Sequence, residues 1–397
     1  MKYEYTKFNG VNVAPKGATR IVFKNGENEV CSIPAERFEG LTPPTGKPIY
    51  SFGIISDAHM GYNSYDYYNP APENVGTRLD DGNGYGYTPN GTNLRKALEY
   101  MDGKVEFCCS AGDFTNIGLY SKQSGTPVFY PYQMHEYFDI CALFPTITFY
   151  NIIGNHENYN KHIPTTDLTE GVTLPNGKTF TAGTPVAEVY KYYTGNDLNY
   201  TIERKGDLFV FISQTTNTLP MSDDTFNWLA TTLEANKDRR CFVFVHSFID
   251  ENTNPADGGI VDSGNPCFAR DNSLFGYWGK AKTTNFMNLL KQYEKVVLFH
   301  GHSHMKFESQ EYDKEANYTE RNGFKSVHAP SLGDPRILKG ADGSWNEDKF
   351  GGQFYIVDVY TDCIILRGMY VYKENKDSTT LKVVPVPLGT YKIAIKQ

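Results

Sequence analysis

The chain has 397 residues, of which 40% are hydrophobic and 21% charged, as in an ordinary globular protein that can bury a full core. Its formal net charge of −8 comes with no basic stripe, which argues against bulk nucleic acid as a partner. The sequence shows no signal peptide and no apolar run approaching about 18 residues, so we expect no membrane partner and take a cytoplasmic location as the default.

The first 45 residues are expected to form a small β appendage and a linker. Two short runs with β-strand character, Arg20–Phe23 and Glu29–Ser32, precede the segment LTPPTGKP, whose proline and glycine residues are typical of a linker. We therefore divide the chain into an N-terminal β appendage at 1–45 and a main domain at 46–397.

In the main domain predicted strands and helices alternate, and the C-terminal part is predicted to be mostly strand. The predicted strands are 49–56, 105–110, 146–152, 200–204, 208–213, 241–245, 295–299, 324–328, 353–359, 364–372, 381–386 and 391–395. The predicted helices are 93–101 with Thr92 as N-cap, 132–143, 224–235 and 284–293. This order predicts an α/β fold, a four-layer α/β/β/α sandwich with two mixed β-sheets.

Three long inserts, at 60–91, 157–188 and 249–282, are expected to carry substrate specificity. Many of the 29 tyrosines lie in loops rich in glycine and asparagine, which favours loops packed by their own side chains over a surface that stacks on a sugar or base. The seven cysteines include no C-x-x-C pair, and the neighbours Cys108 and Cys109 should point to opposite faces of a strand. Reduced structural thiols are the expectation.

Polar residues that can bind metal ions follow five of the predicted strands directly. They are Asp57-Ala58-His59, Gly112-Asp113, Gly154-Asn155-His156-Glu157, His246 and Gly301-His302-Ser303-His304. Each group alone is typical of a turn or a hydrogen-bonded histidine, but five together at the carboxyl ends of strands predict one metal site. Imidazole, carboxylate and amide ligands suit Mn, Fe or Zn, and Asp113 is the candidate to bridge two divalent ions.

The set D-x-H, GD, GNH[D/E], H and GHxH, in this order over about residues 49–330, resembles the calcineurin-like metallophosphoesterase superfamily. The resemblance implies one metal ion bound by Asp57, His59, Asp113 and His304, and a second bound by Asp113, Asn155, His246 and His302. It further implies that His156 faces the substrate, contacts the phosphoryl oxygens and protonates the leaving group, with Glu157 as an orienting partner.

The implied reaction is hydrolysis of a small phosphate ester by a metal-bridging hydroxide, with a phosphodiester slightly preferred. A phosphomonoesterase or nucleotidase, and a binding or structural module that retains the fold, are the alternatives. Asn116 stands where the purple acid phosphatases carry a tyrosine at the end of GDxxY, which argues against that subclass.

We expect structural roles or solvent-exposed positions for the remaining histidines and basic residues that stand out. Structural roles are expected for His135, His162, His300 and His328. Phosphate contact is considered for Arg270, Lys280 and Arg336, although solvated surface cations are the favoured reading. Nothing in the sequence supports a homo-oligomer.

Overall fold

The structure is a computed structural model of the chain. It describes residues 2–5, 16–25, 28–35, 38, 41, 44–60, 89–116, 120–123, 126–158, 172–174, 176–216, 219–247, 249, 253–254, 259–260, 278, 280–307, 317–320, 323–333, 335–339, 344–347, 351–373 and 381–397. Most of the inserts expected at 60–91 and 249–282 lie outside these residues, as do His162 and Arg270.

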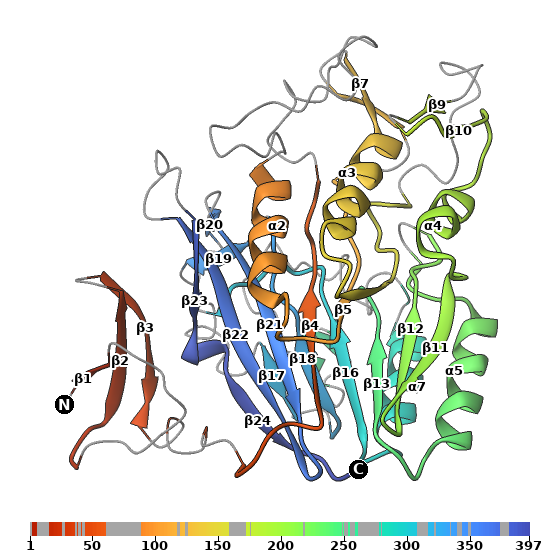
Figure 1. Cartoon of the computed structure of the whole chain (residues 1–397). Coiled ribbons are helices and arrows are strands. Elements are labelled where there is room, and N and C mark those ends of the chain that lie inside the picture. The colour runs from red at the N-terminus through yellow and green to blue at the C-terminus, as the bar shows by residue number, and fades with distance from the viewer. Residues whose placement is uncertain are drawn as a thin grey trace.

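Two mixed sheets form the centre of the molecule (Figure 1). The first has the order β23-β22-β21-β4-β5-β8, with β24 paired to β22, and the second has the order β11-β12-β13-β16-β18-β17. The strands of the first are β4 (Tyr50–Ile55), β5 (Phe107–Ser110), β8 (Thr148–Asn151), β21 (Gly352–Val359), β22 (Cys363–Lys373), β23 (Leu381–Pro385) and β24 (Tyr391–Ala394). Those of the second are β11 (Asn199–Arg204), β12 (Asp207–Ile212), β13 (Cys241–Phe244), β16 (Val296–His300), β17 (Tyr318–Thr319) and β18 (Lys325–His328).

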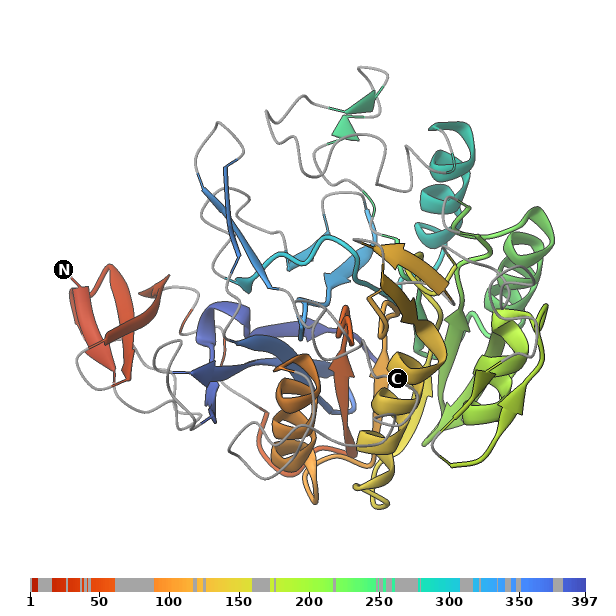
Figure 2. The same ribbon diagram turned by 90° about the horizontal axis from the view of Figure 1, so that it is seen from above.

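Helices cover the outer face of each sheet, which confirms the predicted α/β/β/α layers. On the first sheet lie α2 (Pro89–Met101), α3 (Tyr130–Ala142) and α4 (Val186–Thr194), whose apolar side chains form one buried cluster with the sheet. On the second lie α5 (Asp223–Ala235) and α7 (Lys280–Leu290), which bury Leu229 and Phe286 against β13 and β16. Viewed from above, the orange and yellow α2 and α3 lie well apart from the green and teal α5 and α7 (Figure 2).

Aromatic side chains fill the space between the two sheets. Phe52 of β4 and Phe107 of β5 stack with their ring centroids 5.2 Å apart, and Phe209 of β12 meets Phe52 edge-on at 5.3 Å. The strand alternation places Cys109 in this central cluster and Cys108 in the cluster under the helices, as predicted. The stacked rings therefore join the two sheets into one core.

A buried ion pair joins the amino-terminal ends of the strands. Asp207, at the start of β12, accepts bonds from Arg240 Nε (2.9 Å) and Nη2 (2.6 Å), and both side chains are fully buried. Tyr50, at the start of β4 in the first sheet, donates its hydroxyl to Asp207 Oδ2 (2.5 Å), and Arg240 Nη1 donates to the carbonyl of Tyr360. This network ties the two sheets together at the edge opposite to the strand carboxyl ends.

The N-terminal segment forms a three-stranded sheet beside the C-terminal strands (Figure 1). In it β2 (Arg20–Asn25) pairs parallel to β1 (Lys2–Tyr5) and antiparallel to β3 (Asn28–Pro34). Ile21 and Ile33 belong to the same buried cluster as the core between the main sheets. The small N-terminal sheet is thus confirmed, while its division from the main domain at residue 45 stays a prediction.

Some local predictions differ from the structure. Helix α2 begins at Pro89, so Thr92 lies inside the helix and its predicted capping role is wrong; proline is well suited to a first helical turn because it needs no donor there. Helix α4 lies partly in the insert predicted to be irregular. Four short hairpins were also not predicted, namely β6–β7 (Tyr120–Gln123, Thr126–Phe129), β9–β10 (Val172–Thr173, Thr179–Phe180), β14–β15 (Thr253–Asn254, Gly259–Ile260) and β19–β20 (Arg336–Lys339, Ser344–Glu347).

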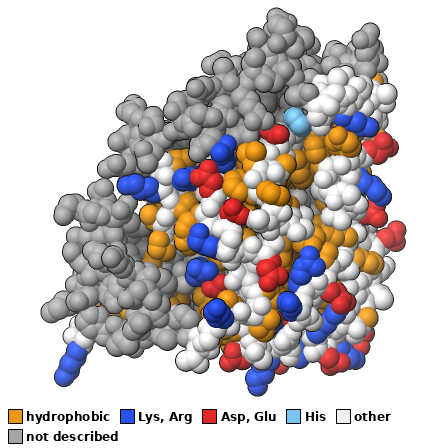
Figure 3. All heavy atoms as spheres, viewed as in Figure 1, with side chains coloured by type: hydrophobic (Ala, Val, Ile, Leu, Met, Phe, Trp, Pro, Cys, Tyr) orange, Lys and Arg blue, Asp and Glu red, His pale blue; other side chains and the backbone are white. Residues whose placement is uncertain are grey.

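The surface carries both signs of charge. Over the described part of the face shown in Figure 3, acidic and basic side chains are mixed, and the basic ones form no stripe there. None of the helices that the structure describes is long and apolar enough to cross a membrane.

Candidate metal centre

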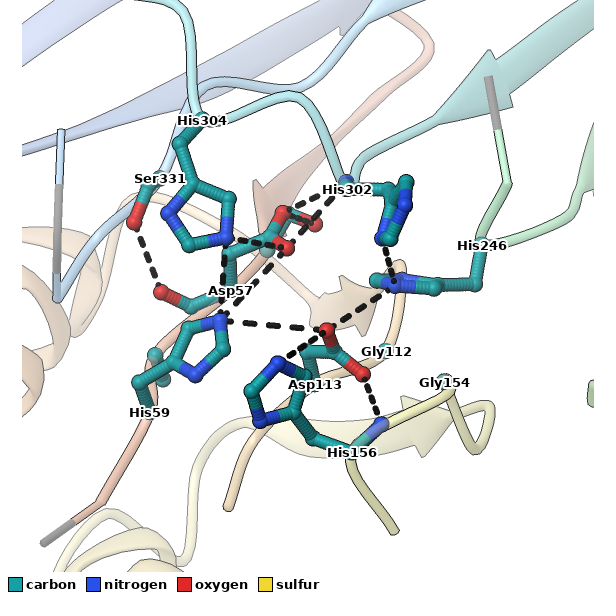
Figure 4. A network of polar contacts seen from close by, with 12 residues as sticks. Asp57, His59, Gly112, Asp113, Gly154, His156, His246, His302, His304 and Ser331 are labelled. Carbon is teal, nitrogen blue, oxygen red and sulfur yellow. Dashed lines mark hydrogen bonds and ion pairs between the residues drawn. The ribbon is translucent and has the colours of Figure 1, made fainter. Parts of the chain in front are cut away.

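The predicted ligands lie at one edge of the molecule, where five strands end. Asp57 and His59 follow β4, Asp113 follows β5 and Asn155 follows β8, while His246 follows β13 and His302 and His304 follow β16 (Figure 4). The loops are bonded to one another: the Asp57 amide donates to Gly112 O (3.0 Å), and the Gly301 amide donates to His246 O (3.0 Å). The predicted convergence of these residues is therefore present in the fold.

The first group of side chains contains Asp57, His59 and His304, whose ligand atoms lie within 4.8 Å of one another. His59 Nε2 is 3.0 Å from His304 Nε2, and His304 Nε2 is 3.3 Å from Asp57 Oδ1. The Asp57 carboxylate is held by the backbone amide of His302 (3.1 and 3.0 Å to the two oxygens).

The second group contains Asp113, His246 and His302, again within 4.8 Å. His246 Nε2 lies 3.0 Å from Asp113 Oδ2, 2.9 Å from Asn155 Oδ1 and 3.1 Å from His302 Nδ1. Asp113 Oδ2 is also 3.8 Å from His59 Nε2 of the first group. Asp113 therefore lies between the two groups, as a bridging ligand must.

The donor set of this second group fits a metal ion. His246 Nδ1 contacts the carbonyl of Ala111 (2.8 Å), and a neutral imidazole that donates there presents a lone pair at Nε2. That lone pair would face the oxygens of Asp113 and Asn155; in the metal-free protein the raised pKa of His246, about 9, places a proton on Nε2, which donates to Asp113 Oδ2 (3.0 Å). Once the ring has lost this proton, the buried acceptors repel one another unless a cation lies among them, and this mixture of nitrogen and oxygen suits Mn, Fe or Zn.

Without a metal ion, a proton compensates the negative charge. Burial lowers the pKa of His246, but Asp113 outweighs burial and raises the pKa to about 9. Burial raises the pKa of Asp113, but His246 and His156 outweigh it and hold the pKa well below its usual range. The carboxylate is therefore ionised at neutral pH.

The backbone at the candidate ligands is strained. Six non-glycine residues in the described chain have positive φ, and five of them are candidate ligands: Asp57 (49°), His59 (46°), Asp113 (51°), His302 (73°) and His304 (59°). A non-glycine residue in this region costs about 1–3 kcal/mol, and such strain gathers at functional sites. Hence the fold holds these side chains in place against a local conformational preference.

Two glycines of the motifs leave room for the carboxylates. A Cβ atom at Gly154 would lie 2.1 Å from Asp113 Oδ1, and one at Gly301 would lie 2.6 Å from Asp57 Oδ2. Any larger residue would displace the carboxylate, so the glycines before Asn155 and His302 are needed for close approach.

His156 forms a third group with His59 and Asp113, whose ligand atoms also lie within 4.8 Å of one another, and its ring has a different partner from the one predicted. Its amide donates to Asp113 Oδ1 (2.9 Å), its Nδ1 contacts the carbonyl of Asn116, and its Nε2 lies 4.0 Å from Asp113 Oδ2. The expectation that Glu157 orients this ring is wrong. Glu157 instead accepts bonds from the amides of Thr115 (2.8 Å), Gly154 (2.7 Å) and Asp113 (3.2 Å), and so links two ligand loops.

Burial and Asp113 together raise the pKa of Glu157 to about 8. Burial lowers the pKa of His156 to about 4. In the metal-free protein the His156 ring is therefore neutral at pH 7.

The structure adds residues that sequence reasoning missed. Asn90, in the first turn of α2, donates to the carbonyls of Ala58 (3.0 Å) and His59 (2.8 Å) and so supports the first ligand loop. No sequence signal singled it out, because it lies at the end of a long insert. Of the phosphate-contact candidates, Lys280 begins α7 and Arg336 begins β19, and their side chains lie outside what the structure describes. His300 contacts the Ser326 hydroxyl (3.2 Å), in keeping with its structural reading.

Comparisons with known proteins give a family and a set of similar structures. The family model "Calcineurin-like phosphoesterase" matches residues 50–306. Among solved structures, the chain is similar to a single mutant of Vps29 from Entamoeba histolytica at 9% identity, covering 85% of this chain and 99% of that one, with a TM-score of 0.29. Vps29 from Chaetomium thermophilum gives 10% identity, 88% and 100% coverage and a TM-score of 0.32. A hypothetical protein from Thermus thermophilus is 10% identical; the match covers 86% of this chain and 99% of that one, with a TM-score of 0.32.

No curated protein matches the chain. The family match begins at β4, whose loop carries the first candidate ligand, and ends just beyond His304, the last. The family model covers more than half of the chain and includes every candidate ligand loop, so the chain belongs to the calcineurin-like phosphoesterase family.

Proposed function

We propose that this protein is a metal-dependent phosphoric ester hydrolase with two metal ions. The observation that carries the proposal is the position of Asp113. Its Oδ2 is buried and lies between His246 Nε2 (3.0 Å) and His59 Nε2 (3.8 Å). One carboxylate oxygen facing two separate sets of ligands is the arrangement that a shared bridge between two cations requires.

The residues would divide between the two ions as the motifs imply. Asp57, His59 and His304 with Asp113 hold one ion, and Asn155, His246 and His302 with Asp113 hold the other. Two divalent ions, Mn, Fe or Zn, would stabilise phosphoryl charge as Lewis acids and would lower the pKa of water so that a hydroxide nucleophile is available near neutral pH.

His156 is proposed to act on the substrate side of the site. Its side chain is 22% exposed, whereas Asp57, Asp113, His246 and His304 are at most 5% exposed. With Nδ1 fixed at the Asn116 carbonyl, Nε2 is the atom that can contact a phosphoryl oxygen and deliver a proton to the leaving group. Because the ring is neutral in the metal-free protein, this acid role requires proton uptake when the anionic substrate enters.

The proposed substrate is a small phosphate ester, with a phosphodiester ahead of a monoester or nucleotide. The preference rests on the D-x-H form of the first motif, Asp57-Ala58-His59, which resembles diesterase and nucleotidase branches. A binding module that keeps the fold is the competing function. Such a module has no need for strained backbone at five candidate ligands, and this favours the enzyme.

The test is hydrolysis of bis-nitrophenyl phosphate and nitrophenyl phosphate by protein loaded with Mn²⁺, with metal content measured in the same samples. We expect about two ions per chain and faster turnover of the diester. Asp113→Ala serves as the matched variant, and it should lose at least one ion together with activity, because the bridge between both ion sites is gone. Wild-type protein that binds two ions but hydrolyses neither compound would favour the binding module. Protein that binds no metal would refute the site itself.

A further inference from the structure

A segment beyond the matched residues 50–306 joins the two sheets at the edge that carries the candidate ligands. It is His328–Gly333, which begins at the last residue of β18 in the second sheet. At its start the Ala329 amide donates to His300 O of β16 (2.7 Å). Further along, the Gln353 amide of β21 in the first sheet donates to Ser331 O (2.9 Å). We call this segment the bridging segment.

The bridging segment binds the backbone of the D-x-H loop, Asp57–His59. The Ser331 hydroxyl donates to Asp57 O (2.8 Å), and the Gly333 amide donates to the same carbonyl (3.1 Å). Close approach is needed here, because a Cβ atom at Gly333 would lie 2.0 Å from Ala58 O. Figure 4 shows Ser331 reaching Asp57 from the side opposite to the ligand atoms.

The same segment also contacts the GHSH loop, Gly301–His304. His328 Nε2 is 2.5 Å from the hydroxyl of Ser303, the residue between the candidate ligands His302 and His304. Both partners are buried, with 1% of His328 and none of Ser303 exposed. On its other side, His328 Nδ1 is 3.5 Å from the side-chain amide of Asn317. The Ser303 hydroxyl is thus fixed by a ring that is itself held in place.

These two loops hold four of the five strained candidate ligands. Asp57 and His59 have φ of 49° and 46°, and His302 and His304 have φ of 73° and 59°. Strained backbone persists only where surrounding contacts determine it, and the bridging segment supplies such contacts to both loops from outside the ligand set.

We propose that Ser331 and the Ser303–His328 pair are positioning residues for the metal ligands. The proposal rests on the proposed metal centre. Ser331 acts on the D-x-H loop and so mainly on the ion of Asp57, His59 and His304. Ser303 lies between a candidate ligand of each ion, so it acts on both.

The competing explanation is that these contacts only satisfy buried polar groups and stabilise the fold. The test must therefore separate metal affinity from stability. Thr390→Val is the matched control: Thr390 is 2% exposed, and its hydroxyl donates to Val386 O (3.2 Å) away from the site. The variant loses a buried hydroxyl of the same kind, whose partners Val386 and Gly368 lie outside the ligand loops.

The experiment is calorimetric titration of metal-free full chain with Mn²⁺, together with thermal unfolding of the metal-free samples. Outer contacts of metal ligands typically contribute about 10–100-fold in metal affinity. We expect Ser331→Ala to lower the Mn²⁺ affinity of one of the two ion sites by that factor. Ser303→Ala should lower the affinity of both sites, and Thr390→Val should lower neither. The unfolding midpoints of the three variants should fall by similar amounts.

The pattern can fail in ways that point to different errors. Ser331→Ala and Ser303→Ala with wild-type affinities for both ions would overturn the positioning role and leave the metal centre standing. If the Mn²⁺ affinity of both sites fell equally in Ser331→Ala and in the control Thr390→Val, the cause would be a general loss of stability. That result would also overturn the positioning role. Wild-type protein that takes up no Mn²⁺ would instead overturn the metal centre on which the inference rests.

Discussion

The buried pair of Asp207 and Arg240 allows a quantitative prediction. Changing Asp207→Asn keeps the size of the side chain but removes the charge that compensates Arg240. Both residues are fully buried, and the pair is bidentate at 2.9 and 2.6 Å. Breaking a buried ion pair by removing one partner costs about 3–5 kcal/mol, because an uncompensated charge stays in the core.

A neighbouring pair provides the control. Glu203 and Arg239 each lie close to the buried partners in sequence, and their ion pair is of similar length at 2.7 Å. The Glu203 side chain is 66% exposed, however, so solvent screens this pair. Glu203→Gln should therefore leave the unfolding midpoint unchanged within error.

Thermal unfolding of metal-free protein, followed by circular dichroism, measures both variants. For a chain of this length we take about 2 °C per kcal/mol, so Asp207→Asn should lower the midpoint by about 6–10 °C. Arg240→Met in the Asp207→Asn background should recover part of the loss, since no charge is then left buried. A midpoint for Asp207→Asn within 1–2 °C of that for Glu203→Gln, on the scale of about 2 °C per kcal/mol, would refute the reasoning.

Three further predictions concern the site. His156→Ala should keep both metal ions and lose about 10²–10⁴-fold in kcat, more for poor leaving groups than for nitrophenolate; equal loss across leaving groups would reject the acid role. Protein loaded with iron in air should show no purple charge-transfer band in its visible spectrum, because Asn116 cannot supply a phenolate; a strong band would contradict this. Metal binding should strengthen with pH up to about 9, since His246 must lose its proton to bind; affinity that stays constant between pH 9 and about 6.5 would contradict the raised pKa.

Much of the site could be predicted because its ligands follow strands directly. The residues Asp57, Asp113 and His246 each come within two positions of a buried apolar run, and parallel strands bring their carboxyl ends to one edge. Local sequence was therefore enough to predict that these residues, which are far apart in the chain, lie close together in the fold. The α/β/β/α order of the layers could likewise be predicted, from the alternation of predicted strands and helices.

Other features depend on contacts that the sequence does not show. The role of Ser331 requires its hydroxyl to meet a carbonyl 274 positions earlier in the chain. The family resemblance implies that Glu157 orients His156, but the Glu157 carboxylate instead accepts hydrogen bonds from three backbone amides of two loops. Helix α4 was not predicted, although Val186, Val189 and Tyr190 have helical spacing, because the residues that precede it suggested an irregular insert.

Each candidate ion site takes ligands from both sheets. Asp57 and His59 come from the first sheet and meet His304 from the second, while Asp113 and Asn155 from the first meet His246 and His302 from the second. Bound ions would therefore act as cross-links between the two halves of the sandwich. At the opposite edge the halves are joined by the hydrogen bonds from Tyr50 to Asp207 and from Arg240 to the Tyr360 carbonyl. At the carboxyl edge the bridging segment and the bonds from the His302 amide to Asp57 remain when the metal is removed, so this edge should loosen while the two sheets stay joined.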